Sequence, residues 1–200
     1  MSERDNYRLD FEFPGLIEQI EDRGDYVAFR TPSLPGFYWG NYLLFPNPPG
    51  QEDYDRWRAA FRAEFGSVEE LHHEAFGWDT PTGEVGNVEP FVEAGFRVSR
   101  SSAMLARQVT RPPHLSAEVE VRVADSEKEW TAATACIAEY SREGATVNRR
   151  LARKLEIWRD LTEKGAGVWY NAYLNGRVVG GLGTYRIQNT FVIDDVATHP

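Results

Sequence analysis

Hydrophobic positions along this chain recur with two different periods, which predict a mixture of helices and strands. From residue 51 to residue 65, Trp57, Phe61 and Phe65 return every four residues, and this spacing predicts a helix with one buried stripe. The other elements predicted in the first half are, in chain order, strands over 25–30, 37–45 and 71–78, a short helix capped by Asn87 and ending at Gly95, and a strand over 99–109. A mixed α/β unit is therefore expected here.

The second half opens with a strand and two helices. Val119, Val121 and Val123 share one face of the predicted strand. Ser126 and Glu129 have the spacing of a capping box, in which the hydroxyl caps an end N–H and the carboxylate bonds back to the capping residue. Each helix is expected to bury one stripe: Trp130, Ala133 or Thr134, Ile137 and Tyr140 in the first, and Val147, Leu151, Leu155, Trp158 and Leu161 in the second.

Three strands are predicted behind these helices. Asn175-Gly176 lies between two apolar runs that start at Gly167 and end at Arg186, and an Asn-Gly pair in this position is typical of a type I′ hairpin. A last strand is predicted from Thr190 to the end of the sequence. The order in this half is therefore strand, helix, helix, hairpin, strand.

The segment Arg111-Pro-Pro-His-Leu-Ser116 is the predicted boundary between two domains. Two consecutive prolines lack backbone donors and fit neither the interior of a helix nor a central strand. We therefore predict domains over 1–115 and 116–200, and a hydrophobic content of 42% in 200 residues is enough to give the chain a real core.

The net charge of −9 bears on the expected partners. Surfaces that bind nucleic acid gather Lys and Arg against phosphate, so an acidic chain argues against such a partner. No apolar run approaches the roughly 18 residues needed to cross a bilayer, and the first residues lack the apolar core of a signal peptide. A cytoplasmic protein with no membrane partner is expected.

The histidines and the single cysteine do not predict a metal site or a catalytic nucleophile. His72 and His73 are adjacent in a predicted strand, so they point apart and do not simply chelate one ion, and no metal site is predicted. The single cysteine, Cys136, excludes an intrachain disulfide and is interpreted as a small core residue.

Two sequence runs in the second half carry a family resemblance. They are Tyr170-Asn-Ala-Tyr-Leu-Asn-Gly-Arg-Val-Val-Gly-Gly-Leu-Gly-Thr-Tyr185 and Asp194-Asp-Val-Ala-Thr-His-Pro200. In that order, behind two helices, they resemble the hairpin and central strand of GNAT-superfamily N-acetyltransferases. The resemblance implies an α/β fold with a mixed sheet, in which residues 116–200 form the first half of a GNAT domain. The sequence stops before the Arg/Gln-x-x-Gly-x-Gly/Ala loop that grips the coenzyme A pyrophosphate in that family.

The first half also resembles this family, in a degenerate form. Val88-Glu-Pro-Phe-Val-Glu-Ala-Gly-Phe96 is similar to the family's late helix and strand entry. The loop Pro46-Asn-Pro-Pro-Gly50 stands where a phosphate-binding loop is expected, but its prolines supply no N–H groups for a phosphate. The whole chain then resembles a tandem GNAT protein with a degenerate first copy.

The resemblance implies direct acyl transfer from acetyl-CoA to a small-molecule amine. The backbone of Val196, Ala197 and Thr198 would face the pantetheine arm, and Asp194 or Asp195 would act as base. Because adjacent strand residues point to opposite faces, only one of these two carboxylates could face the site. The residues implied for the acceptor pocket are Tyr140, Glu143 and Arg149, which border the turn between the two helices.

Three functional hypotheses follow. The first is an acetyl-CoA-dependent N-acetyltransferase that is weak or inactive in this form, because the pyrophosphate loop is missing. The second is a non-catalytic module that binds a small molecule or a protein. In the third, residues 51–109 supply the missing back half for residues 118–200. The last strand would lie at a sheet edge, so a homodimer or strand exchange through residues 190–200 is also predicted.

Overall fold

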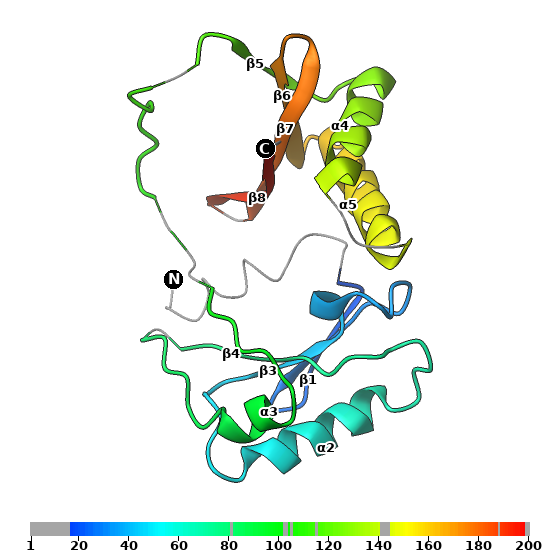
Figure 1. Cartoon of the computed structure of the whole chain (residues 1–200), viewed down its shortest axis with the longest axis vertical. Helices are drawn as coiled ribbons and strands as arrows, with labels where there is room; N and C mark the ends of the chain where they lie inside the picture. Colours follow the sequence, from blue (N-terminus) through cyan, green and yellow to red (C-terminus); the bar gives the residue numbers. More distant parts are fainter. Residues whose placement is uncertain are drawn as a thin grey trace. The chain divides into compact units, whose positions relative to one another are not determined.

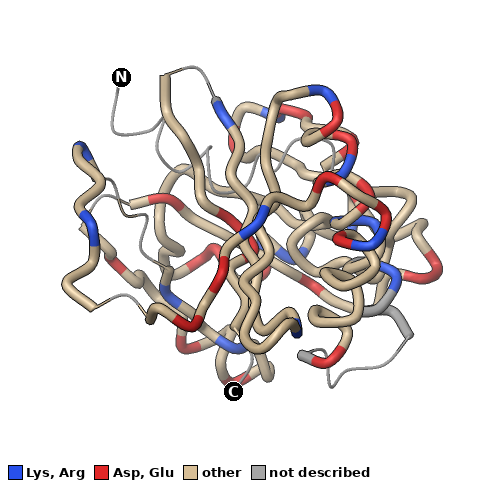
Figure 2. Tube along the Cα trace, turned by 90° about the horizontal axis from the view of Figure 1, so that it is seen from above, with Lys and Arg blue, Asp and Glu red and all other residues tan. Residues whose placement is uncertain are grey.

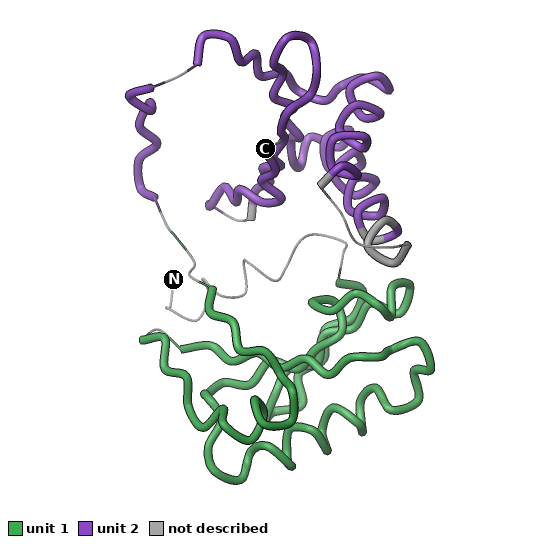
Figure 3. The backbone as a smooth tube through the Cα atoms, in the orientation of Figure 1, with its two compact units in different colours: residues 1–105 green, residues 106–200 purple. Residues whose placement is uncertain are grey.

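The computed structural model describes residues 17–80, 82–101, 104, 106–114, 116–140, 145–187 and 189–198, with the backbone alone for residues 140, 145–148, 150 and 187. The chain divides into two compact units, Met1–Leu105 and Ala106–Pro200, each with its own sheet (Figure 3). Each unit is described by itself below.

The first unit packs helices on one face of a four-stranded sheet. Its elements are β1 (Gln19–Asp22), β2 (Val27–Arg30), the 3₁₀ helix η1 (Tyr38–Gly40), β3 (Tyr42–Phe45), α2 (Asp53–Phe65), β4 (Phe76–Trp78) and α3 (Glu89–Glu93). The strand order is β1-β2-β3-β4, in which β3 and β4 pair in parallel and the other neighbours are antiparallel. The long helix α2 lies along the sheet (Figure 1).

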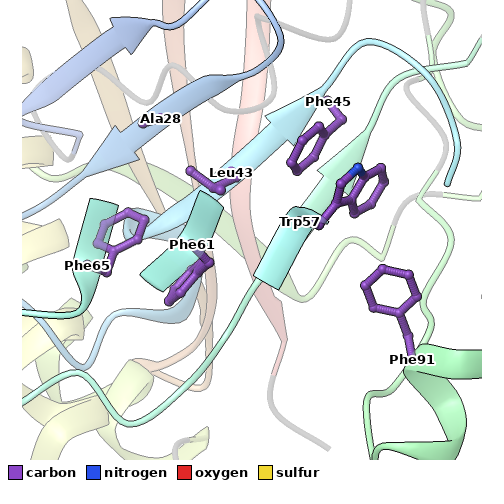
Figure 4. Close-up of a cluster of buried hydrophobic side chains, with 7 residues drawn as sticks. All are labelled: Ala28, Leu43, Phe45, Trp57, Phe61, Phe65 and Phe91. Carbon is purple, nitrogen blue, oxygen red and sulfur yellow. The ribbon is translucent and has the colours of Figure 1, made fainter. Parts of the chain in front are cut away.

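The predicted stripe of α2 forms the centre of this core. Trp57, Phe61 and Phe65 are all buried, as their spacing predicted. The indole of Trp57 stacks on the ring of Phe45 with centroids 3.9 Å apart. Figure 4 shows this cluster, whose buried members are Ala28, Leu43, Phe45, Trp57, Phe61, Phe65 and Phe91.

Several predictions for the first unit were wrong in detail. Residues 37–45 do not form one strand, because Tyr38–Gly40 is a 3₁₀ turn ahead of β3. Only Phe76–Trp78 of the predicted strand over 71–78 is extended and paired. Within the described part of residues 99–109 there is no strand. The short helix α3 is present, but its N-cap is Val88 and not Asn87.

The second unit carries two helices on one face of an antiparallel sheet. Its elements are β5 (Val119–Val123), α4 (Glu127–Tyr140), α5 (Ala145–Glu163), β6 (Gly167–Leu174), β7 (Arg177–Ile187) and β8 (Thr190–Thr198). The strand order is β5-β6-β7-β8, so β8 is an edge strand. Both helices lie on the same side of this sheet (Figure 1).

Alternation in β6 identifies the face that the helices cover. Trp169, Asn171 and Tyr173 are buried and contact α4 or α5, whereas the residues between them are half-buried. The turn between β6 and β7 confirms the predicted hairpin, because Asn175 and Gly176 have φ angles of 51° and 78°, which a type I′ turn requires.

Acidic and basic residues are interspersed along the Cα trace (Figure 2). Many of them pair locally, as in the exposed ion pair of Arg153 with Glu156 on α5. Among the residues that the structure describes, no helix is long and apolar enough to cross a membrane.

Candidate functional site

The candidate site lies at an irregularity in the edge strand β8. Gly181 pairs with Ala197, while Gly183 pairs with Asp194, so β8 carries one more residue than β7 across this interval. The extra residue makes a β-bulge. Asp195 within it has a φ of 53°, which is in the left-handed region that residues other than glycine rarely adopt.

The Asp195 carboxylate is bonded to helix α5. Its Oδ2 accepts a hydrogen bond of 3.0 Å from Trp158 Nε1, and its Oδ1 accepts one from Lys154 Nζ. Trp158 is fully buried and packs against Trp169 and Tyr185. These bonds show that Asp195 points toward the helices and is engaged there.

Asp194 contributes differently to the same bulge. Its Oδ1 accepts a 2.7 Å hydrogen bond from the backbone N–H of Asp195. The two predicted base candidates therefore have separate partners: Asp194 bonds the backbone of the bulge, and Asp195 bonds α5. Asp194 remains half-buried.

The three residues predicted to face a pantetheine arm follow directly. The side chains of Val196 and Thr198 are exposed, and Ala197 is half-buried opposite Gly181. Because β8 is an edge strand, alternate N–H and C=O groups along it point away from β7. A bound chain that adds to this edge would meet those groups.

Among the residues predicted for the acceptor pocket, Arg149 is the one whose side chain the structure describes. Arg149 is exposed on α5 and lies N-terminal to Lys154 on that helix. Tyr140 is the last residue of α4 and only its backbone is described, and Glu143 lies outside the described residues. In the described part of the chain, no hydrogen bond or ion pair connects Arg149 to β8.

A buried polar network beside the site was missed by the capping-box interpretation. Glu129 N donates to Ser126 Oγ at 3.4 Å, which confirms half of the predicted box. The carboxylate does not return to Ser126 but accepts hydrogen bonds from Asn171 Nδ2, at 3.0 Å, and from the Tyr173 hydroxyl. Trp169 Nε1 completes the network by donating to Asn171 Oδ1 at 2.9 Å.

The network shifts the pKa values of both its acidic groups. Burial opposes ionisation of Glu129, but hydrogen bonds from Tyr173 and Asn171 and the charge of Arg122 outweigh it and lower the pKa. Burial and the hydrogen bond to Glu129 raise the pKa of Tyr173 to about 12. Glu129 is therefore an ionised carboxylate that ties α4 to β6. Polar residues at inward positions of β6 were the sequence signal for it.

Other reactive side chains do not form a centre of their own. Within the described residues, no group of three or more His, Cys, Asp or Glu could hold a metal ion. Cys136 is buried, as predicted, and burial raises the pKa of its thiol. Burial lowers the pKa of His73, whose Nε2 lies 3.2 Å from the carbonyl oxygen of Asn41.

The proline-rich loop of the first unit does not have the form of a phosphate cradle. Its Gly50 N–H donates to Asp53 Oδ2 at 2.8 Å, and Pro46, Pro48 and Pro49 have no N–H. Gly86 packs so closely on the loop that an added Cβ would lie 2.6 Å from the Pro49 carbonyl oxygen. A phosphate needs several inward N–H groups, which this loop does not supply.

The chain was compared with known protein families, curated proteins and solved structures. No protein-family model and no curated protein matches the chain significantly. A GCN5-related N-acetyltransferase from Kribbella flavida matches 97% of the chain and 72% of its own length, with a TM-score of 0.51 and 14% identity. A functionally unknown conserved protein from Staphylococcus epidermidis ATCC 12228 matches 94% and 74%, with a TM-score of 0.64 and 14% identity.

The chain has a GNAT-like fold. At 14% identity, the two similar structures show the fold alone. The α/β architecture and the GNAT resemblance expected from the sequence are confirmed at that level.

Proposed function

We propose that the chain belongs to an acyltransferase lineage, in which an acyl group passes from acetyl-CoA to a small-molecule amine. The observation that carries the proposal is a bulged edge strand, β8, in a GNAT-like fold, at the residues whose sequence resembles the family's central strand. A bulge redirects backbone groups and is common beside active sites.

In this proposal the backbone of Val196, Ala197 and Thr198 holds the pantetheine arm. The amine nitrogen attacks the thioester carbonyl, the C–N bond forms, and the C–S bond breaks. Coenzyme A leaves as the thiolate, which takes up the proton that the amine gives to the base. Asp194 takes the amine proton, directly or through water, whereas both carboxylate oxygens of Asp195 accept hydrogen bonds from α5.

Calorimetric titration of acetyl-CoA into the 200-residue chain tests the binding half of the proposal. A dissociation constant in the micromolar range or below supports it, and the absence of binding heat at about 100 micromolar acetyl-CoA contradicts it. Thiol release with a panel of primary amines then tests transfer.

Asp194→Asn tests the proposed base. Removing a general base lowers kcat by about 10²- to 10⁴-fold while leaving acetyl-CoA affinity near the wild-type value. Asp160→Asn is the matched control, because Asp160 is an exposed residue of α5 that pairs with Lys164. An equal effect of both substitutions would argue against a base at Asp194.

A second candidate is a non-catalytic binding module with the same fold. The observation in its favour is that both aspartates of the bulge make structural hydrogen bonds, one to backbone and one to α5. Such a module would bind acetyl-CoA or another ligand along β8 but release no thiol with any amine. Binding without turnover is therefore the outcome that favours it.

A further inference from the structure

We infer that Lys154 and Trp158 hold Asp195 in a latch that fixes the bulge of β8, and that Asp195 is a positioning residue. The α5–β8 latch means these three side chains. The effect of the latch on acyl-CoA binding rests on the proposed function. Its effect on the backbone conformation of β8 does not.

The backbone of the bulge needs an external restraint. Asp195 is held at a φ of 53°, and aspartate tolerates this left-handed conformation better than most residues but still at a cost. Leu182 stands opposite two residues of β8, so the ladder with β7 is interrupted there. Unfavourable backbone conformations persist where the surrounding structure determines them. Within β8, Asp194 Oδ1 accepts a 2.7 Å hydrogen bond from Asp195 N, and the contacts from α5 restrain the bulge from outside the strand.

The two donors on α5 supply that restraint. Lys154 and Trp158 are four residues apart, so they lie on one face of the helix. They donate to the two different oxygens of the carboxylate, which fixes its orientation as well as its distance. The side chains of Lys154 and Asp195 are about one fifth exposed, so this pair is less screened than a fully exposed surface pair.

Trp158 is itself held firmly. Its ring packs between Trp169 and Tyr185, and it covers Gly183, where an added Cβ would lie 2.1 Å from the indole. The donor of the latch is therefore part of the core of the second unit. The bulge is tied to that core through one indole N–H and one ammonium group.

The latch determines which way the following residues face. If the bulge closed or moved by one residue, the faces of Val196, Ala197 and Thr198 would be exchanged, because side chains alternate along a strand. The same shift would redirect the N–H and C=O groups that the proposed function assigns to the pantetheine arm. The latch therefore links the position of α5 to the geometry of the β8 edge.

Four substitutions in the 200-residue chain separate the parts of the latch. Lys154→Met removes the ammonium, and Trp158→Phe removes the indole N–H but keeps an aromatic ring. Asp195→Gly removes the carboxylate but makes the left-handed backbone free of strain. Arg153→Met is the control, because it removes a positive charge from the neighbouring residue of α5, whose partner Glu156 is on the same helix.

Hydrogen exchange measured by mass spectrometry on peptides covering 190–198 is the primary readout. We expect exchange there to become at least tenfold faster in Lys154→Met, Trp158→Phe and Asp195→Gly, with exchange in α2 of the first unit unchanged and Arg153→Met like wild type. Wild-type exchange in Asp195→Gly would overturn the inference, because a left-handed residue alone would then be enough. Wild-type exchange in Lys154→Met and Trp158→Phe would overturn it too.

Acetyl-CoA affinity of the same variants separates this inference from the proposed function. If wild type binds and the latch variants bind tenfold or more weakly, both stand. If wild type does not bind but exchange accelerates as expected, the latch stands and the proposed function fails. If all variants bind like wild type and exchange is unchanged, the latch fails and the proposed function stands.

Discussion

At the residue scale, the packing beside β8 leaves no room for a side chain at Gly183 of β7. An added Cβ at Gly183 would lie 2.1 Å from the indole of Trp158, which is fully buried. We predict that Gly183→Ala destabilises the second unit by about 1–3 kcal/mol, the usual cost of overpacking a core. Thermal unfolding followed by tryptophan fluorescence measures this. Gly50→Ala is the control, since its nearest neighbour would be 3.6 Å away.

The ionised carboxylate of Glu129 predicts how the second unit responds to acid. The pKa of Glu129 is lower in the folded state than in the unfolded state. Its contribution to the free energy of unfolding is therefore complete at pH values above its pKa in the unfolded chain, and it is lost as the pH falls through its pKa in the folded chain. The groups that face it are Tyr173 and Asn171 on β6 and Arg122 on β5, with Lys128 beside it on α4. We therefore expect the stability of this unit to fall below about pH 4.

Glu129→Gln tests this dependence. Glutamine can still accept a hydrogen bond from Tyr173 but does not titrate, so the difference in unfolding free energy between wild type and variant should shrink as the pH falls. A difference that stays constant from pH 6 to pH 3 would contradict the assignment. At alkaline pH the relevant group is Tyr173, whose pKa is raised to about 12 in the folded state. Its contribution to the free energy of unfolding is complete at pH values below the usual tyrosine pKa, and it is lost as the pH rises through about 12.

At the scale of elements, the helix α2 and the sheet it covers depend on Trp57. Its ring stacks on Phe45, and its Nε1 is buried with no hydrogen-bond partner among the described residues. We predict that Trp57→Ala costs about 3–5 kcal/mol, whereas Trp57→Phe costs roughly 1–2 kcal/mol because it removes part of the ring but no hydrogen bond. Urea unfolding measures both, with the exposed Arg62→Ala expected within about 0.5 kcal/mol of wild type.

Elements with strong local signals were predictable from the sequence. The four-residue stripe of α2 and the Asn175-Gly176 turn are encoded by neighbours in the chain, and both formed as predicted. The 3₁₀ turn before β3 was not predictable in this way, because it is held by hydrogen bonds of the buried Asn41 side chain. Its Oδ1 accepts from Thr31 N at 2.9 Å, and its Nδ2 donates to the carbonyls of Leu34 and Phe37. Such side-chain bonds replace a strand ladder without changing the hydrophobic pattern.

The hydrogen-bond partners around the bulge were not predictable from the sequence, and a binding or catalytic role for residues 194–198 stays a prediction. The resemblance pointed to residues 194–198, and the bulge lies there. The bonds from Lys154 and Trp158 to Asp195 join residues about forty positions apart, and no spacing rule connects them. The spacing of Glu129 likewise predicts a capping residue, but its carboxylate accepts hydrogen bonds from Asn171 and Tyr173 on β6. Tertiary contacts of this kind override a correct local signal.

At the scale of the molecule, one face of the second sheet is strongly apolar. Val121 lies opposite Ala172, on the side of the sheet away from Asn171 and Tyr173, which meet the helices. Phe191 and Ile193 on β8 are 74% and 64% exposed. The large exposed side chains of these strands are Val119, Val121, Val123, Phe191, Ile193 and Val196. Exposed apolar side chains gathered along a strand are typical of interaction sites.

We propose that a second copy of the chain covers part of this surface by pairing along β8. An edge strand with exposed apolar side chains is a template for an identical strand, because two antiparallel copies satisfy each other's backbone groups and bury the same side chains. Light scattering at micromolar concentration should give twice the mass of one chain. Because each copy carries a net charge of −9, added salt should screen their repulsion and preserve or strengthen the dimer.

Ile193→Lys is the decisive variant, because it places a charge in the middle of β8, where burial against a second copy would desolvate it. We expect a monomer with unchanged far-UV circular dichroism. Val121→Lys should weaken the dimer less, since β5 is at the opposite edge of the sheet. Val92→Lys on α3 of the first unit, about half exposed in the same way, should remain dimeric. A wild-type chain that is monodisperse and monomeric would contradict the proposed dimer.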